Sequence, residues 1–247
     1  MFEIHPLQSL LGLDPDLGQL LSPERRSAAE QQVSVTVATA GPGQWRPGQL
    51  CPAHRASNVG LLVVSGVLVR EMRLLDPPSA ELFGPGDIIR TWHADAAPQM
   101  VSASTEWRAL ERTSVAVMDG STAMALRSYP EVMAVVLDRL NARAERLAVT
   151  QAISQITGVE TRVEALLWHL SQRWGKVGRD GVIVGLALSH RMIGSLVGAR
   201  RPTVSTALAR LVDDGRVVRR ADGSWLLTAT EPPLAQSDPA RAAVLAA

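Results

Sequence analysis

The stretch LSHRMIGSLVGARRPTVSTALARLVDDGRVVRR, residues 188–220, predicts two short helices joined by a glycine turn and followed by a basic hairpin. Ser189 can cap the first helix, because its hydroxyl can accept hydrogen bonds from exposed backbone N–H groups. Gly198 suits the end of that helix, where a left-handed residue is common. Pro202 fits the first turn of the second helix, since the N–H that proline lacks would have no intrahelical partner there. This arrangement is typical of a protein that presents one helix to a groove of DNA.

The second helix has an apolar face and a polar, basic face. Its apolar residues recur at i, i+4, i+7 and i+8, as on a helix packed against a core: Val204, Leu208, Leu211 and Val212. Thr203, Thr206 and Arg210 fall on the other side, with Pro202 nearby. Short hydroxyl side chains allow close approach to phosphates, and an arginine near the helix start matches the O6 and N7 acceptors of guanine. The polar face therefore suits the major groove.

A β-hairpin is expected after this helix. Residues 216–220 lead through the turn Ala221-Asp222-Gly223-Ser224 into Trp225-Leu226-Leu227. Such a wing places Arg219 and Arg220 near the sugar-phosphate backbone. The alternative is an ordinary pair of helices in a domain core, but the agreement of cap, turn, proline, polar face and hairpin favours DNA binding.

The charge distribution supports the same interpretation. Residues 160–230 contain eleven arginines and lysines against six acids, although the whole chain has a formal net charge of only +1. A basic C-terminal domain is therefore joined to a mildly acidic N-terminal one, and only the former suits a polyanion.

Composition limits the class of protein further. With 247 residues, 46% of them hydrophobic, the chain can form two domains. The single cysteine, Cys51, excludes an intrachain disulfide framework and a cluster held by four cysteines of one chain. The N-terminus lacks the features of a signal peptide, and the apolar runs are too short to span a bilayer. We expect a soluble cytoplasmic protein with no membrane partner.

The first part of the chain predicts short strands after a helix that starts at Ser22-Pro23-Glu24 and runs to about Gln31. Residues 33–37 alternate strictly, as a half-buried strand does. Gly/Pro turns follow at close spacing, for example Gly41-Pro42-Gly43 and Gly84-Pro85-Gly86. Many short strands with such turns indicate an antiparallel barrel or sandwich.

A long helix is expected from about residue 129. One line of residues follows a heptad spacing: Met133, Leu137, Leu140, Ala144, Leu147, Gln151 and Ser154. Arg139, Arg143, Glu145 and Arg146 lie off this line. The heptad line becomes polar at its end, at Gln151 and Ser154. It therefore fits either a short dimer contact or a contact with the chain's own barrel. We favour the dimer, because DNA-binding proteins of this shape usually bind paired half-sites. A further amphipathic helix begins near Thr161.

The order of barrel, long helix and winged helix-turn-helix resembles the Crp/Fnr family of bacterial transcription regulators. Residues 193–205 are similar to that family's helix-turn-helix signature, and residues 59–67 and 82–89 to its cyclic-nucleotide-binding barrel. The resemblance implies an α+β protein with an N-terminal antiparallel jelly-roll barrel (1–126), a dimerisation helix (127–158), a winged helix-turn-helix domain (159–230) and a flexible tail (231–247).

The resemblance also implies roles for residues of the second helix. Arg201 matches the family's guanine-reading arginine, Pro202 and Thr206 match the other base-facing positions, and Arg200 and Thr203 suit phosphate contacts. Ser205, Arg210, Arg219 and Arg220 complete the expected DNA-binding set. The family often has glutamate and arginine where Pro202 and Thr206 stand, so we expect a different or shorter base pattern. The implied partners are double-stranded DNA, a second copy of the chain and, as a candidate, RNA polymerase.

The barrel departs from the cyclic-nucleotide binders. Those proteins have a glycine and a glutamate where this chain has Arg90 and Thr91, and an arginine near the position of Ala103-Ser104. A buried cyclic phosphate without a counter-charge would be poorly compensated, so cyclic AMP or GMP is not expected to be the effector. Residues of an altered pocket for an unknown effector are Arg90, Thr91, Trp92, Trp107 and Arg108, although tryptophans often simply fill a barrel.

No cofactor or metal is expected. Cys51, His54, His93 and Asp95 show no recognised ligand spacing, and the chain has no phosphate loop, no G-x-S-x-G elbow and no H-E-x-x-H pattern. We therefore expect a regulator and not an enzyme. The alternative is a small-molecule sensor that acts through protein partners and has a vestigial DNA module.

Overall fold

The computed structural model describes residues 2–50, 58–90 and 103–228. By contacts the chain divides into two compact units, residues 1–74 with 81–146, and residues 75–80 with 147–247. Its strands are β1 (Glu3–Ser9), β2 (Ser34–Ala40), β3 (Gly43–Trp45), β4 (Gly60–Ser65), β5 (Leu68–Arg73), β6 (Ser79–Phe83), β7 (Ile88–Ile89), β8 (Ser104–Ala109), β9 (Thr113–Met118), β10 (Gly175–Gly178), β11 (Gly181–Val184), β12 (Val217–Arg219) and β13 (Trp225–Leu227). Its α-helices are α1 (Leu10–Leu13), α2 (Pro23–Gln32), α3 (Gly120–Ala125), α4 (Pro130–Gln155), α5 (Val159–Trp174), α6 (His190–Val197) and α7 (Arg201–Asp213). Short 3₁₀ turns lie at Pro15–Gly18, Pro47–Gln49 and Leu126–Ser128.

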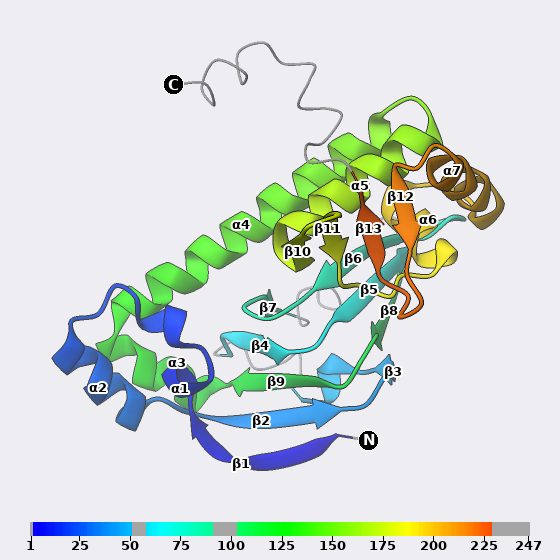
Figure 1. Cartoon of the computed structure of the whole chain (residues 1–247). Helices are drawn as coiled ribbons and strands as arrows, with labels where there is room; N and C mark the ends of the chain where they lie inside the picture. Colours follow the sequence, from blue (N-terminus) through cyan, green and yellow to red (C-terminus); the bar gives the residue numbers. More distant parts are fainter. Residues whose placement is uncertain (1, 51–57, 91–102, 229–247) are drawn as a thin grey trace. The chain divides into compact units, whose positions relative to one another are not determined.

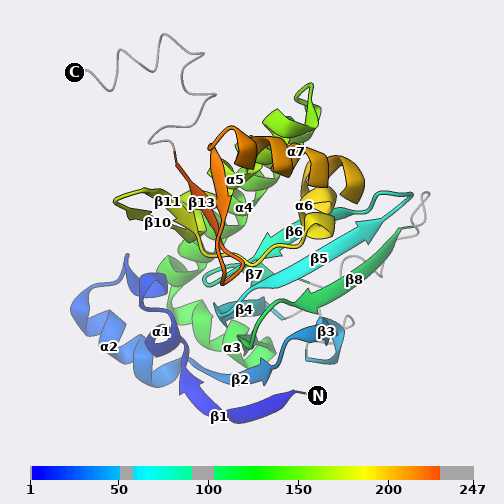
Figure 2. The same cartoon turned by 45° about the vertical axis from the view of Figure 1, so that its right-hand side comes forward.

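The strand-rich part is a jelly-roll-like pair of antiparallel sheets, as predicted, although its described strands do not close into one barrel. One sheet has the order β1-β2-β9-β4-β7 and the other β3-β8-β5-β6 (Figures 1 and 2). The alternating run predicted at residues 33–37 is strand β2, which starts at Ser34 and continues to Ala40. Strand β1 was not expected from the sequence.

Buried residues of both sheets form the core of the jelly roll. Trp45, Leu61, Phe83 and Val115 are at most 3% exposed. Trp107 packs between Trp45 and Phe83, at ring centroid distances of 5.9 and 5.2 Å. Aromatic pairs at these distances add stability beyond their buried area, so this tryptophan contributes to the core.

The start of α4 packs on the same unit. Val132, Val135 and Val136 join an apolar cluster that includes Leu10 and Leu11 of α1, and Met133 and Leu140 are partly buried against it. The N-cap of α2 is Ser22, as predicted.

Three arginines then continue the inward face of α4 at i, i+4 and i+7. Arg139 contacts Asp14, Arg143 contacts Glu81 and Arg146 contacts Asp87, with shortest nitrogen–oxygen distances of 2.5, 2.6 and 2.5 Å. The heptad line is divided between two environments. Met133 and Leu140 pack against the chain's own core. In contrast, Leu137 is 62% exposed and Leu147 is 37% exposed.

The second unit contains the predicted helix-turn-helix and hairpin. Helices α5, α6 and α7 pack together, and their sheet has the order β10-β11-β13-β12 (Figure 2). The hairpin of β12 and β13 was predicted, whereas β10 and β11 were not. No helix in the described part of the chain is long and apolar enough to cross a membrane.

Candidate nucleic-acid interface

Helix α7 begins and packs as its sequence predicts. Arg200 is its N-cap position and Pro202 lies in its first turn. Val204, Leu208 and Leu211 are at most 3% exposed, so this stripe faces the core. Val212, which the periodicity also assigned to the core, is 43% exposed. On the remaining surface of α7, these residues are exposed: Arg201, Pro202, Thr203, Thr206, Ala209, Arg210 and, at its end, Asp213.

Helix α6 and the turn after it hold α7 in place. The Ser189 hydroxyl accepts from the Met192 N–H at 3.2 Å, and Gly198 has the left-handed φ of 66°. Both features agree with the sequence prediction. A Cβ on Gly194 would lie 2.5 Å from the backbone oxygen of Ala199, so only glycine allows this close approach. Arg162 of α5 donates to the Val197 carbonyl at 3.0 Å. This hydrogen bond links the turn after α6 to α5.

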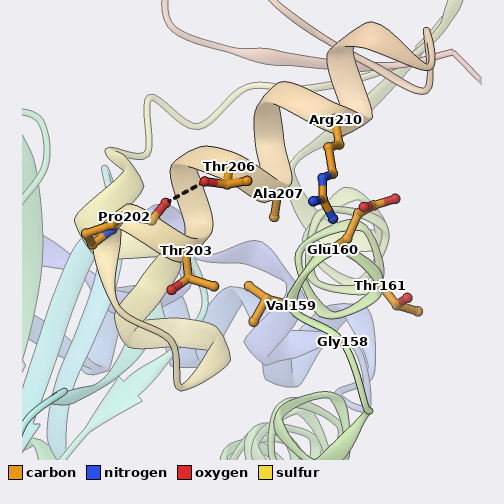
Figure 3. A pocket seen from close by; sticks show the side chains of 9 residues that line it. All are labelled: Gly158, Val159, Glu160, Thr161, Pro202, Thr203, Thr206, Ala207 and Arg210. Carbon is orange, nitrogen blue, oxygen red and sulfur yellow. Dashed lines mark hydrogen bonds between the residues drawn. The ribbon is translucent and has the colours of Figure 1, made fainter.

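An open hollow of about 660 Å³ lies between the outward face of α7 and the start of α5 (Figure 3). Helix α5 follows Gly158 with no side-chain cap, so the positive end of its dipole borders the hollow. The side chains that line it from α7 are those of Pro202, Thr203, Thr206, Ala207 and Arg210. Helix starts and arginines both favour phosphate. Glu160 also lines the hollow, and its carboxylate is paired with Arg216 at 3.2 Å, so the side of the hollow formed by α7 is the part suited to an anionic backbone.

Ser205 differs from the other residues of the predicted DNA-binding set. It is half-buried, its hydroxyl donates to the Arg201 carbonyl at 3.0 Å, and it lies 2.9 Å from Nδ1 of His190. Because the single serine proton is already donated to a carbonyl, His190 must be the donor in the second bond. Ser205 therefore joins α7 to α6, a contact that the sequence did not indicate.

The wing carries its two arginines on the surface. Arg219 and Arg220 are exposed, and the Arg219 guanidinium lies 5.0 Å from the ring centroid of Trp225. The predicted turn is closed by Asp222, which accepts from the backbone N–H and hydroxyl of Ser224 at 2.9 and 2.6 Å. These hydrogen bonds, the one from the Ser224 hydroxyl first, lower the pKa of the Asp222 carboxyl. The turn thus keeps a fixed shape between β12, which ends at Arg219, and the apolar strand β13.

Arg216 is held at the junction of α7 and β12. Its Nε donates to Glu164 Oε1 at 3.0 Å and its Nη1 to Glu160 Oε1 at 3.2 Å, and Nη2 contacts the other Glu164 oxygen. The Glu164 side chain is 4% exposed. The pairing neutralises a carboxylate inside the domain and links α5 to the start of the wing.

Three of the five predicted effector-pocket residues, Arg90, Trp107 and Arg108, lie in the described part of the structure. Trp107 belongs to the jelly-roll core, whereas Arg90 and Arg108 are exposed. Thr91 and Trp92 lie outside the described residues, as do Cys51, His54, His93, Asp95 and the tail at 231–247. The described residues include no group of three histidine, cysteine or acidic side chains suited to a metal.

The pH dependence of the stability should reveal the environment of His190, which contacts Ser205. Burial, followed by the charges of Arg219 and Arg201, lowers the pKa of His190 below its ordinary value of about 6.5. Below that value the unfolded chain binds more protons than the folded one, so His190 should reduce stability as pH falls through 6.5 toward its folded pKa.

We expect the wild-type protein to lose more stability than His190→Asn between pH 7.5 and 5.5, measured by urea unfolding. Asparagine keeps an N–H donor for Ser205 but does not titrate in this range. Equal losses in both proteins would contradict the role of His190.

Comparison with known proteins agrees with this architecture. Residues 161–231 match the model of the Crp-like helix-turn-helix domain. A search of curated proteins finds no significant match. Among solved structures, a cyclic nucleotide-binding domain containing protein from Listeria monocytogenes EGD-e superposes with a TM-score of 0.65 at 14% identity, covering 87% of this chain and 97% of that one.

Two further structures have the same fold. A CooA mutant from Carboxydothermus hydrogenoformans gives a TM-score of 0.58 at 17% identity, with coverage of 78% of this chain and 83% of that one. FixK2 from Bradyrhizobium japonicum gives 0.50 at 19% identity, with coverage of 79% and 93%. The class of fold is therefore a jelly-roll-like pair of sheets combined with a C-terminal winged helix-turn-helix domain, as in these structures. Residues 161–231 therefore form a Crp-like helix-turn-helix domain, and the chain shares the fold of these solved structures.

Proposed function

We propose that the protein is a homodimeric, sequence-specific DNA-binding regulator whose α7 helices enter successive major grooves of a palindromic site. The observation that supports this most is the division of α7 into a buried apolar stripe and an exposed face with Arg201, Thr206 and Arg210. Such a face fits a major groove, and the neighbouring hollow fits the adjoining backbone. Because its target would be the chromosome, we propose that the protein acts in the cytoplasm, with RNA polymerase as the protein partner.

Dimerisation would use the outer line of α4. Leu137, Ala144 and Leu147 are exposed on this helix, while Arg139, Arg143 and Arg146 face the jelly roll. An apolar line that the chain's own core leaves partly uncovered suits the same line of a second copy. Two copies would place their recognition helices about 34 Å apart, one turn of DNA.

We also propose that cyclic AMP and cyclic GMP are not required. Arg90 and Thr91 replace the glycine and glutamate of cyclic-nucleotide binders, and Ala103-Ser104 provides no cation where their arginine stands. Trp107 fills the core, so it offers less to an alternative pocket than the sequence suggested. Any effector would therefore be of another kind.

Selection from a random duplex pool by the purified protein, with and without cyclic AMP, tests both parts of this proposal. A palindromic consensus that the nucleotide does not change is expected. Strong dependence of DNA binding on cyclic AMP would contradict the proposal that cyclic nucleotides are not required. Absence of binding to any duplex at low salt would favour a sensor that acts through protein partners.

Arg201 and Arg200 should have separable roles. Arg201→Ala is expected to lower affinity for the selected site by about 1–3 kcal/mol and to relax selection at one base pair, because a bidentate contact to guanine is lost. Arg200→Ala should weaken specific and non-specific duplexes more evenly and reduce the salt dependence. Titrations at several salt concentrations measure both effects, and the same losses in both variants would contradict this assignment.

A further inference from the structure

The Thr206 hydroxyl is turned back onto its own helix. Its Oγ1 lies 3.3 Å from the Pro202 carbonyl oxygen, to which it donates (Figure 3). A carbonyl can only accept, so the one hydroxyl proton is committed to this bond. The lone pairs of this oxygen and the γ-methyl group remain available on the exposed surface. Thr206 thus presents an acceptor to solvent and no donor.

Along the stripe through positions 202, 206 and 209 of α7, Thr206 is the residue with a polar side chain. Pro202 lies one turn before it and Ala209 one turn after, and neither side chain can form a hydrogen bond. The Ser205 hydroxyl is committed to Arg201 and His190. A groove that approached this stripe would meet the Thr206 acceptor between Pro202 and Ala209, with the polar side chains of Thr203 and Arg210 beside it.

We propose that Thr206 selects a base with an exocyclic amine, adenine or cytosine, on the strand that it faces. The N6 amine of adenine and the N4 amine of cytosine are the major-groove donors, whereas O4 of thymine and O6 of guanine are acceptors. A keto base at that position would place an acceptor against the lone pair of Thr206. This assignment rests on the proposed function and adds to it the kind of base pair chosen at one position of each half-site.

The size of the preference is limited by the bond to Pro202. To donate to a keto base, the Thr206 hydroxyl must rotate and give up one neutral hydrogen bond, whose net value corresponds to about 3- to 10-fold in an equilibrium constant. We therefore expect amine bases to be preferred over keto bases by about 3- to 10-fold, a smaller factor than a bidentate arginine gives.

Two near-isosteric variants test the proposal in the full-length protein. Thr206→Val keeps the γ-methyl group and the shape but replaces the hydroxyl with a second methyl group, while Thr206→Ser keeps the hydroxyl and its bond to the helix. Wild type, both variants and their thermal melting curves would be compared, and affinities measured on duplexes in which each position of the selected half-site carries all four base pairs.

We expect one position per half-site to prefer adenine or cytosine in the wild type and in Thr206→Ser, and to lose that preference in Thr206→Val. If Thr206→Val keeps the preference, or if the preference follows the methyl group and favours thymine, the assignment is overturned while the proposed function stands. If the wild type selects no sequence above random duplex, both the proposed function and the role of Thr206 are overturned.

Discussion

Leu137→Arg is expected to convert the proposed dimer to a monomer and to lower its affinity for the proposed palindromic site by about 100-fold or more. Leu137 is 62% exposed on α4 and belongs to the heptad line. In a dimer this side chain would be buried against a second copy, and two arginines there would replace an apolar contact with like charges. Joining two half-site contacts in one molecule typically raises affinity by 10²–10⁴, and a monomer loses that gain.

Sedimentation velocity and titration with the selected duplex measure the two effects. Leu20→Arg is the matched control, because Leu20 is also largely exposed, at 55%, but does not belong to α4 or its heptad line. It should remain dimeric and bind as the wild type does. A Leu137→Arg protein that stays dimeric, or a monomer that keeps wild-type affinity, would show that the heptad line is not the interface.

The parts that sequence predicted best are those specified by local backbone chemistry. Ser189, Gly198 and Pro202 each act within a few residues of their own position, as cap, left-handed turn and helix start. Their roles follow from the geometry of a helix end and need no distant partner. The same holds for the hairpin turn closed by Asp222 and Ser224.

Other features were missed because distant residues decide them, or because a signal was passed over. The orientation of Ser205 depends on His190 in another helix. The three arginines of α4 bind carboxylates that lie more than fifty residues away in the sequence. The spacing of the arginines alone therefore could not predict whether they contact the jelly roll or solvent. In contrast, Asp180-Gly181 between β10 and β11 is a recognisable hairpin signal, and that hairpin could have been predicted.

The junction of α7 and the wing contains the charge pair whose loss should cost most. Glu164 is 4% exposed on its side chain and Arg216 is 37% exposed, and the guanidinium contacts both carboxylate oxygens of Glu164. Removing one partner of such a pair leaves a buried charge uncompensated, which typically costs 3–5 kcal/mol. The Arg216 guanidinium is partly exposed to solvent, so the lower end of that range applies. Arg216→Met should therefore reduce the free energy of unfolding by about 3 kcal/mol.

Urea unfolding of Arg216→Met, of the double variant Arg216→Met with Glu164→Leu, and of Arg220→Met separates charge compensation from packing. The double variant should recover most of the lost stability, since two apolar side chains of similar volume can replace a buried ion pair at little cost. Arg220 is exposed in the same hairpin, so its replacement should change stability by less than about 0.5 kcal/mol. If the double variant were as unstable as Arg216→Met alone, Arg216 would act through its packing and its contact with Glu160, and the buried Glu164 charge would not be the cause. Because Arg216 also joins α5 to the first strand of the wing, the single variant should in addition weaken DNA binding at temperatures where it is still folded.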